Sequence, residues 1–181
     1  MENQEVQNNS AHSIKWGVIL GAVGIVLTLL LYIVDIKLLV SGWITGLSFL
    51  LSTVIVFYAS FDYRKALGGY MTFGQAFLHA FVLLAISGLL QVIFSYLLFN
   101  VIDPQAAATL TEAQMEATMQ MMESFGAGGN PEAMDKMAEG FESQYSLGTM
   151  ALGYVYMLVV YSIGAVIVAL ISKKKNKELD F

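Results

Sequence analysis

Four long apolar runs constrain this chain more than any other feature of its sequence. The first covers residues 16–34 without a charge, and the second ends at residue 61. The third covers residues 73–102, and the fourth residues 147–171. About 20 apolar residues in a helix cross the hydrocarbon core of a bilayer, and an open backbone is not tolerated there. The sequence therefore predicts an all-α, polytopic membrane protein with four transmembrane helices.

The composition excludes several classes of chemistry. Only 13% of the residues are charged, whereas a soluble domain carries about 25%. The chain has no cysteine, which excludes disulfides, thiolate nucleophiles and cysteine-ligated zinc. Its two histidines are His12, in a polar stretch, and His79, in an apolar run. With no phosphate-binding glycine loop and no GxSxG or HExxH motif, we expect neither an enzyme nor a bound cofactor or metal.

A different kind of sequence separates the third and fourth runs. Residues 103–146 hold eight acidic residues against one base, Lys136. Asp103 before Pro104 marks a helix start, and Thr111 with Gln114 resembles a capping box. Glycines at residues 126, 128 and 129 and then proline at 131 predict a turn and a second helix start. The insert is therefore predicted to be a helical hairpin.

Basic residues are distributed unevenly between the two sides of the predicted topology. If the termini share one side, that side holds seven basic residues and the other holds two, which fits the positive-inside rule. We therefore expect cytoplasmic termini and an extracytoplasmic hairpin. The predicted segments are a disordered tail (1–13), three spans (14–102), the hairpin (103–146), a fourth span (147–172) and a basic tail (173–181). The seven basic residues are Lys15, Arg64, Lys65, Lys173, Lys174, Lys175 and Lys177, and the other two are Lys37 and Lys136.

Methionine recurs on both predicted hairpin helices at helical spacing. The stripes are Met115, Met119 and Met122 on the first helix, and Met134, Met137 and Phe141, followed by Tyr145, on the second. Such stripes pack on each other or on a membrane surface, or they form an adaptable groove for a partner. Capture of Cu(I) by thioether sulfur is a third interpretation, although helix periodicity already explains the spacing.

Polar residues are few within the predicted spans, and none of the spans has Asp, Glu, Lys or Arg in its central turns. Ser87, Gln91 and Ser95 recur every four residues, so they share one face of the third span. They predict hydrogen bonds between helices or, in the alternative, a lining for a substrate pathway. His79 is expected to form a hydrogen bond near the membrane interface. Small residues, including Gly17, Gly21, Gly24, Gly42 and Gly46, predict close helix packing or a homodimer face.

A glycine- and aromatic-rich string, GYMTFGQAF, stands at residues 69–77, where the third run begins. It resembles a motif of bacterial four-span membrane proteins grouped as the domain of unknown function 4199 family. The overall plan of spans, acidic insert and lysine-rich end is similar too. The family-like residues are Gly69, Tyr70, Thr72, Phe73, Gly74, Ala76 and Phe77. The resemblance implies a multi-pass protein of a bacterial inner membrane, and it transfers no substrate, cofactor or catalytic residue.

The same string also has a physical interpretation. Gly68 and Gly69 free the backbone for a turn, and Thr72 is placed to cap the third helix. Tyr70 and Phe73 suit the membrane interface.

These observations favour a non-enzymatic interaction or structural component of the inner membrane that uses its periplasmic hairpin. The expected partners are the lipid bilayer together with a second copy of the chain or a periplasmic protein, and nucleic acid is not expected. The alternative is a small oligomeric transporter or channel component.

Overall fold

The computed structural model describes the backbone of residues 2–124 and 131–174, and the side chains of residues 10–124, 135–141 and 143–174. Over this part of the chain the regular structure is helical, with one isolated bridge between Met71 and Lys174. Four helices are long and apolar enough to cross a membrane, as the sequence predicts. The all-α, polytopic fold class is therefore confirmed.

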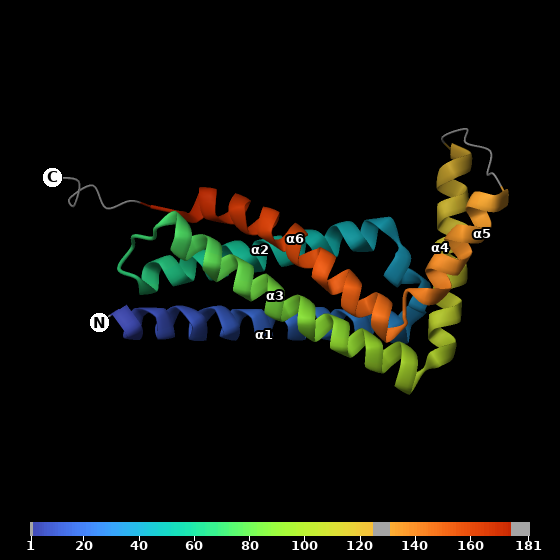
Figure 1. Cartoon of the computed structure of the whole chain (residues 1–181), viewed down its shortest axis with the longest axis horizontal. Helices are drawn as coiled ribbons and strands as arrows, with labels where there is room; N and C mark the ends of the chain where they lie inside the picture. Colours follow the sequence, from blue (N-terminus) through green and yellow to red (C-terminus); the bar gives the residue numbers. More distant parts are fainter. Residues whose placement is uncertain (1, 125–130, 175–181) are drawn as a thin grey trace. The chain divides into compact units, whose positions relative to one another are not determined.

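The helices follow the predicted runs closely (Figure 1). The third run continues past its α-helix through a π-helical turn, and a 3₁₀ turn follows the first helix. In chain order the elements are α1 (Glu2–Asp35), η1 (Ile36–Val40), α2 (Gly42–Ala66), α3 (Phe73–Leu97), η2 (Leu98–Ile102), α4 (Pro104–Ser124), α5 (Pro131–Ser143) and α6 (Leu147–Ser172).

The amino-terminal segment differs from the expectation of a disordered tail over residues 1–13. α1 begins at Glu2, and its apolar span begins at Ser10. Ser13 is buried and bonds to His79 on α3, while His12 lies beside Asp62 on α2. These polar side chains have partners on other helices, so α1 is part of the packed bundle already at residues 12 and 13.

The chain forms two compact units, and the first contains segments of all four long helices (Figure 1). It comprises Met1–Gly24, Phe49–Gln91 and Tyr154–Phe181. Its core includes Leu20, Val56, Ala59, Ala80, Leu83, Ala165 and Val168.

Close helix approach in this unit depends on glycine, as predicted. A Cβ at Gly17 would lie 2.9 Å from both the Ile86 Cβ and the Leu83 carbonyl oxygen, and one at Gly21 would lie 2.8 Å from Leu90. The backbones of α1 and α3 are therefore nearer than larger residues allow.

The second unit comprises Ile25–Ser48 and Val92–Gly153. Within it, α4 packs against η1, η2 and α5. Its core is formed by Leu98, Phe99, Ala106 and Leu110, with Tyr145 packed against them. By contrast with the first unit, Gly42 and Gly46 have no atom within 4 Å of a built Cβ.

The insert forms the predicted pair of helices, α4 and α5. Asp103 caps α4, because its Oδ1 accepts from the backbone N–H groups of Gln105 (3.1 Å) and Ala106 (3.2 Å). The predicted capping box at Thr111 and Gln114 is wrong. Both residues lie inside α4, where their side chains bond to the α5 side of the hairpin. The predicted glycine turn at residues 126–129 lies outside the described residues.

Candidate functional site

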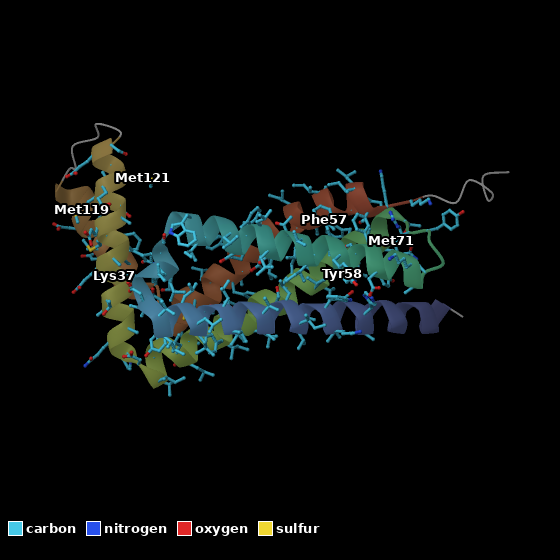
Figure 2. The ribbon with its side chains drawn as sticks, turned by 180° about the vertical axis from the view of Figure 1, so that it is seen from behind. Lys37, Phe57, Tyr58, Met71, Met119 and Met121 are labelled. Carbon is cyan, nitrogen blue, oxygen red and sulfur yellow. The ribbon has the colours of Figure 1, made fainter. Side chains whose placement is uncertain are left out.

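The two hairpin helices leave a shallow groove between them. The predicted stripes meet there, since methionines from both helices line it together with Thr118 and one aromatic ring. Met119 and Met121 lie on α4 (Figure 2), with exposed fractions of 37% and 56%, but only Met119 belongs to the groove. The side chain of Met134 lies outside the described residues. The lining residues are Met115, Thr118, Met119, Met122, Met137 and Phe141.

Two side-chain hydrogen bonds link the helices on one side of the groove. The Thr111 hydroxyl donates to the Phe141 carbonyl oxygen at 3.4 Å, and the Gln144 amide donates to Gln114 Oε1 at 2.6 Å. Tyr145 packs against Phe99, with ring centroids 4.9 Å apart, and does not line the groove. Burial raises the pKa of the Tyr145 hydroxyl, against the opposing effect of a hydrogen bond with Gln114. These bonds therefore link α4 to the α5 side of the hairpin.

The exposed surface of the hairpin is acidic. Within α4 and α5 the described carboxylates are all exposed, whereas the described base is Lys136 alone. An apolar groove on a hairpin that carries exposed carboxylates attracts a segment that is both apolar and basic. The exposed carboxylates are Glu112, Glu116, Glu123, Asp135 and Glu139.

Asp103 connects the start of the hairpin to α1. Its Oδ2 accepts a hydrogen bond from the Tyr32 hydroxyl at 2.7 Å. That bond, helped by the backbone N–H groups of Ala106 and Gln105, holds the pKa of the Asp103 carboxyl below its usual range, against a smaller opposing effect of burial.

In the first unit, the polar residues of the predicted α3 stripe take part in helix packing. The Ser87 hydroxyl donates to the Leu84 carbonyl oxygen of its own helix at 3.0 Å. Gln91 lies over Gly24 of α1, where a built Cβ would be 2.9 Å from the Gln91 Oε1. Ser95 belongs to the second unit and is half-buried. The predicted stripe is thus divided between the two units.

The first unit also contains a polar cluster that the sequence did not predict. The Ser13 hydroxyl and His79 Nδ1 are 2.7 Å apart, and both residues are buried. His12 Nε2 lies 3.2 Å from the Asp62 Oδ2. The His79 ring stacks on Tyr63 at 4.5 Å and lies 5.0 Å from the His12 ring. His79 is therefore buried within the bundle and has the hydrogen bond that the sequence predicted, while its depth in the membrane stays a prediction.

This histidine cluster does not arrange its groups as a hydrolytic triad. The carboxylate of Asp62 faces one imidazole, that of His12, and the hydroxyl of Ser13 faces the other. A triad needs the carboxylate and the hydroxyl on the two nitrogens of a single ring. Among the described residues, no three His, Asp or Glu side chains are grouped in a way that would hold a metal ion.

The family-like string forms the corner between α2 and α3. Gly68 and Gly69 have φ values of +81° and +93°, as a turn of this kind requires. Thr72 caps α3 as predicted: its hydroxyl accepts from the Gln75 N–H at 3.3 Å, and Gln75 Oε1 accepts from the Thr72 N–H at 2.9 Å.

The corner also packs into the first unit. Met71 (Figure 2) is only 1% exposed, and Ala76 is fully buried beside it. Tyr70 and Phe73 are both 41% exposed, and Phe73 stacks on Phe77. Gly74 has open space around its built Cβ. The string therefore supplies a structural corner with an exposed aromatic edge.

A family model described as "Protein of unknown function (DUF4199)" matches residues 15–174. The chain belongs to the DUF4199 family. The match includes all four apolar runs, the hairpin and the corner, so the resemblance expected from GYMTFGQAF is confirmed. No curated protein and no solved structure matches the chain.

The DUF4199 match also shows why the histidine cluster is hard to find from sequence. His79 and Asp62 lie inside the matched region, whereas His12 and Ser13 precede it. The four residues come from three helices, and no local spacing connects the neighbouring His12 and Ser13 to Asp62 or His79. The signal available in the sequence was His79, a polar residue near the end of an apolar helix. A polar residue that is buried needs a hydrogen-bond partner.

Proposed function

We propose that this DUF4199 protein is a non-enzymatic interaction component of a bacterial inner membrane. The methionine-lined groove between α4 and α5 binds a segment of another protein that presents apolar side chains flanked by lysine or arginine. The observation that carries this proposal is the groove itself, with thioethers from both helices and an exposed acidic surface around it.

The side chains around the groove support binding by adaptable packing. Methionine has three rotatable bonds and a polarisable sulfur, so several methionines together accept apolar side chains of differing shape. Met119 is exposed, while Met122 and Met137 are half-buried, so the groove offers both a reachable edge and a floor. The carboxylates add long-range attraction for a basic partner and select against acidic ones.

We infer the topology from charge. Cytoplasmic termini place seven basic residues on the cytoplasmic side of the membrane and the acidic hairpin in the periplasm. The partner is then a periplasmic protein or the periplasmic part of another membrane protein.

The proposal is tested by photo-crosslinking from position 137 of the full-length protein in native membranes. We compare the otherwise native chain with one carrying Met119→Glu and Met122→Glu. Met121→Glu is the matched control, because it adds a charge on α4 outside the groove. The expected result is an adduct with one protein, through a peptide that contains apolar and basic residues. The double variant should lose it and Met121→Glu should keep it.

Two outcomes would contradict the proposal. Adducts only with lipid or with a second copy of the chain would show that the groove does not bind a foreign protein. Equal adduct yield in the double glutamate variant would show that the groove is not the contact.

The transporter alternative receives less support from the geometry. Ser87 bonds within its own helix and Gln91 packs over Gly24, which are roles in helix packing. Solute flux through liposomes remains the measurement that separates the two proposals.

A further inference from the structure

The corner between α2 and α3 is joined to the end of α6 by backbone hydrogen bonds. The Met71 N–H donates to the Lys174 carbonyl oxygen at 2.9 Å, and the Lys174 N–H donates to the Met71 carbonyl oxygen at 2.8 Å. Arg64 adds a third bond, from its Nη1 to the Ser172 carbonyl oxygen at 3.1 Å. Lys173 and Lys174, which follow α6, are therefore held beside the family-like string.

This arrangement brings cations and aromatic rings together. Lys174 Nζ lies 5.6 Å from the centroid of the Tyr70 ring, and Lys173 Nζ lies 6.0 Å from that of Phe73. Lys65 is exposed at the end of α2. An aromatic ring orients an ammonium group without neutralising its charge. The three lysines therefore remain available to an anion.

Carboxylates that would neutralise this corner are scarce. Among the described side chains of the first unit, the acidic residue is Asp62, and it faces His12. The basic side chains of the same unit are Lys15, Arg64, Lys65, Lys173 and Lys174. No described carboxylate lies within ion-pair distance of Lys65, Lys173 or Lys174. Among the described residues these ammonium groups therefore have no carboxylate partner, so they can contact an external anion.

We propose that this corner binds the headgroup of an anionic phospholipid. Lys65, Lys173 and Lys174 contact the phosphate, and the exposed apolar side chains beside them contact the acyl chains. Three spans begin or end here, since α2 ends at Ala66, α3 begins at Phe73 and α6 ends at Ser172.

A phospholipid fits the corner better than free phosphate does. The ends of spans lie at the depth of lipid headgroups, where aromatic rings and lysines are enriched. Tyr70 and Phe73 are 41% exposed, and Leu170 and Ile171 are more than half exposed. Free phosphate would use the ammonium groups and leave these apolar side chains without a contact. Built Cβ atoms at Gly69 and Gly74 meet no atom within 4 Å, so the headgroup has space.

The test is native mass spectrometry of the full-length protein released from bilayers of equal phosphatidylglycerol and phosphatidylcholine. The native chain should retain phosphatidylglycerol in preference to phosphatidylcholine. Replacing Lys65, Lys173 and Lys174 with glutamine should lower that preference by roughly fivefold per lysine removed. Replacing them with arginine should keep it. Lys37→Gln with Lys136→Gln is the matched control in the second unit and should leave the preference unchanged.

Added inorganic phosphate distinguishes the two sources of the anion. Retained phosphatidylglycerol in excess phosphate supports the lipid site, whereas its displacement would make the corner a site for free phosphate and overturn the proposal. Equal preference in the native and glutamine variants would also overturn it, as would loss in the arginine variant. Helical circular dichroism of each variant checks that the bundle is intact.

Discussion

The two units of this chain differ in charge and in how their surfaces are used. The first unit has tightly packed helices, a buried histidine cluster and basic described side chains at its exposed corner. The second unit has open glycines on α2, an acidic hairpin and a groove lined by methionine. Tight packing specifies one arrangement, whereas flexible thioethers accept several. We therefore propose that the first unit supplies structural specificity and the second adaptable recognition.

The largest expected effect tests the difference in packing. Gly17→Leu in the first unit should lower the free energy of unfolding by about 3 kcal/mol, because the new side chain meets Ile86 and the Leu83 carbonyl oxygen. Gly46→Leu in the second unit is the matched control and should change it little, since nothing lies near its built Cβ. Thermal unfolding in detergent measures both. An equal loss of unfolding free energy at positions 17 and 46 would contradict the difference in packing between the two units.

A smaller effect is expected in the histidine cluster. Ser13→Ala leaves His79 Nδ1 without its hydroxyl partner inside the bundle, which should cost about 1–2 kcal/mol. Thr45→Ala is the control, because the exposed Thr45 hydroxyl donates only to the Ser41 carbonyl oxygen of the preceding turn. A stability of Ser13→Ala equal to that of the control would show that the cluster is not a specific element of the fold.

These contacts show how far the sequence could predict the structure. Hydrophobic runs and start signals are local, so they predicted the four spans, the hairpin and the Thr72 cap. The histidine cluster joins residues 50 and 66 positions apart, and the bond from Tyr32 to Asp103 joins residues 71 apart. Periodicity carries no information on which helix supplies such a partner. The Thr111 capping box failed because Asp103, already at the helix boundary, is the cap.

The same limit applied to the candidate sites. The spacing of Met115, Met119 and Met122 predicted a shared helix face, and the structure joins it to Met137 in one groove. Tyr145 has similar spacing to Phe141 but packs on Phe99 instead. The lysines of the corner were predicted as a basic end, whereas their position beside Tyr70 and Phe73 needed the bridge between Met71 and Lys174.

A pH-dependent effect sharpens the account of the second unit. The pKa of Asp103 is lowered in the folded protein, so the stability it contributes is present above its unfolded pKa of about 4 and is lost as the pH falls through the folded pKa. Tyr32→Phe removes the bond that causes this shift. Native and Tyr32→Phe proteins should therefore differ in thermal midpoint at pH 7, and the difference should shrink as the pH falls below about 4. A difference that persists unchanged at pH 3 would contradict the assignment.

The smallest expected effect concerns Gln91. If Gln91 serves packing against Gly24, Gln91→Leu should leave any solute flux through protein-containing liposomes at the level of the native chain. Protein-free liposomes give the baseline. If the native chain gives flux above this baseline and Gln91→Leu abolishes it, the result would favour the transporter alternative and weaken the role assigned to the hairpin.

The most direct test of the comparison is photo-crosslinking from two exposed methionines in native membranes. Met119 lies in the groove of the second unit, and Met157 lies on α6 in the first unit, with a similar exposed fraction. The account predicts adducts with one foreign protein from position 119 and adducts with lipid from position 157. Lipid alone at position 119, or the same protein at both positions, would contradict the claim that recognition belongs to the hairpin groove.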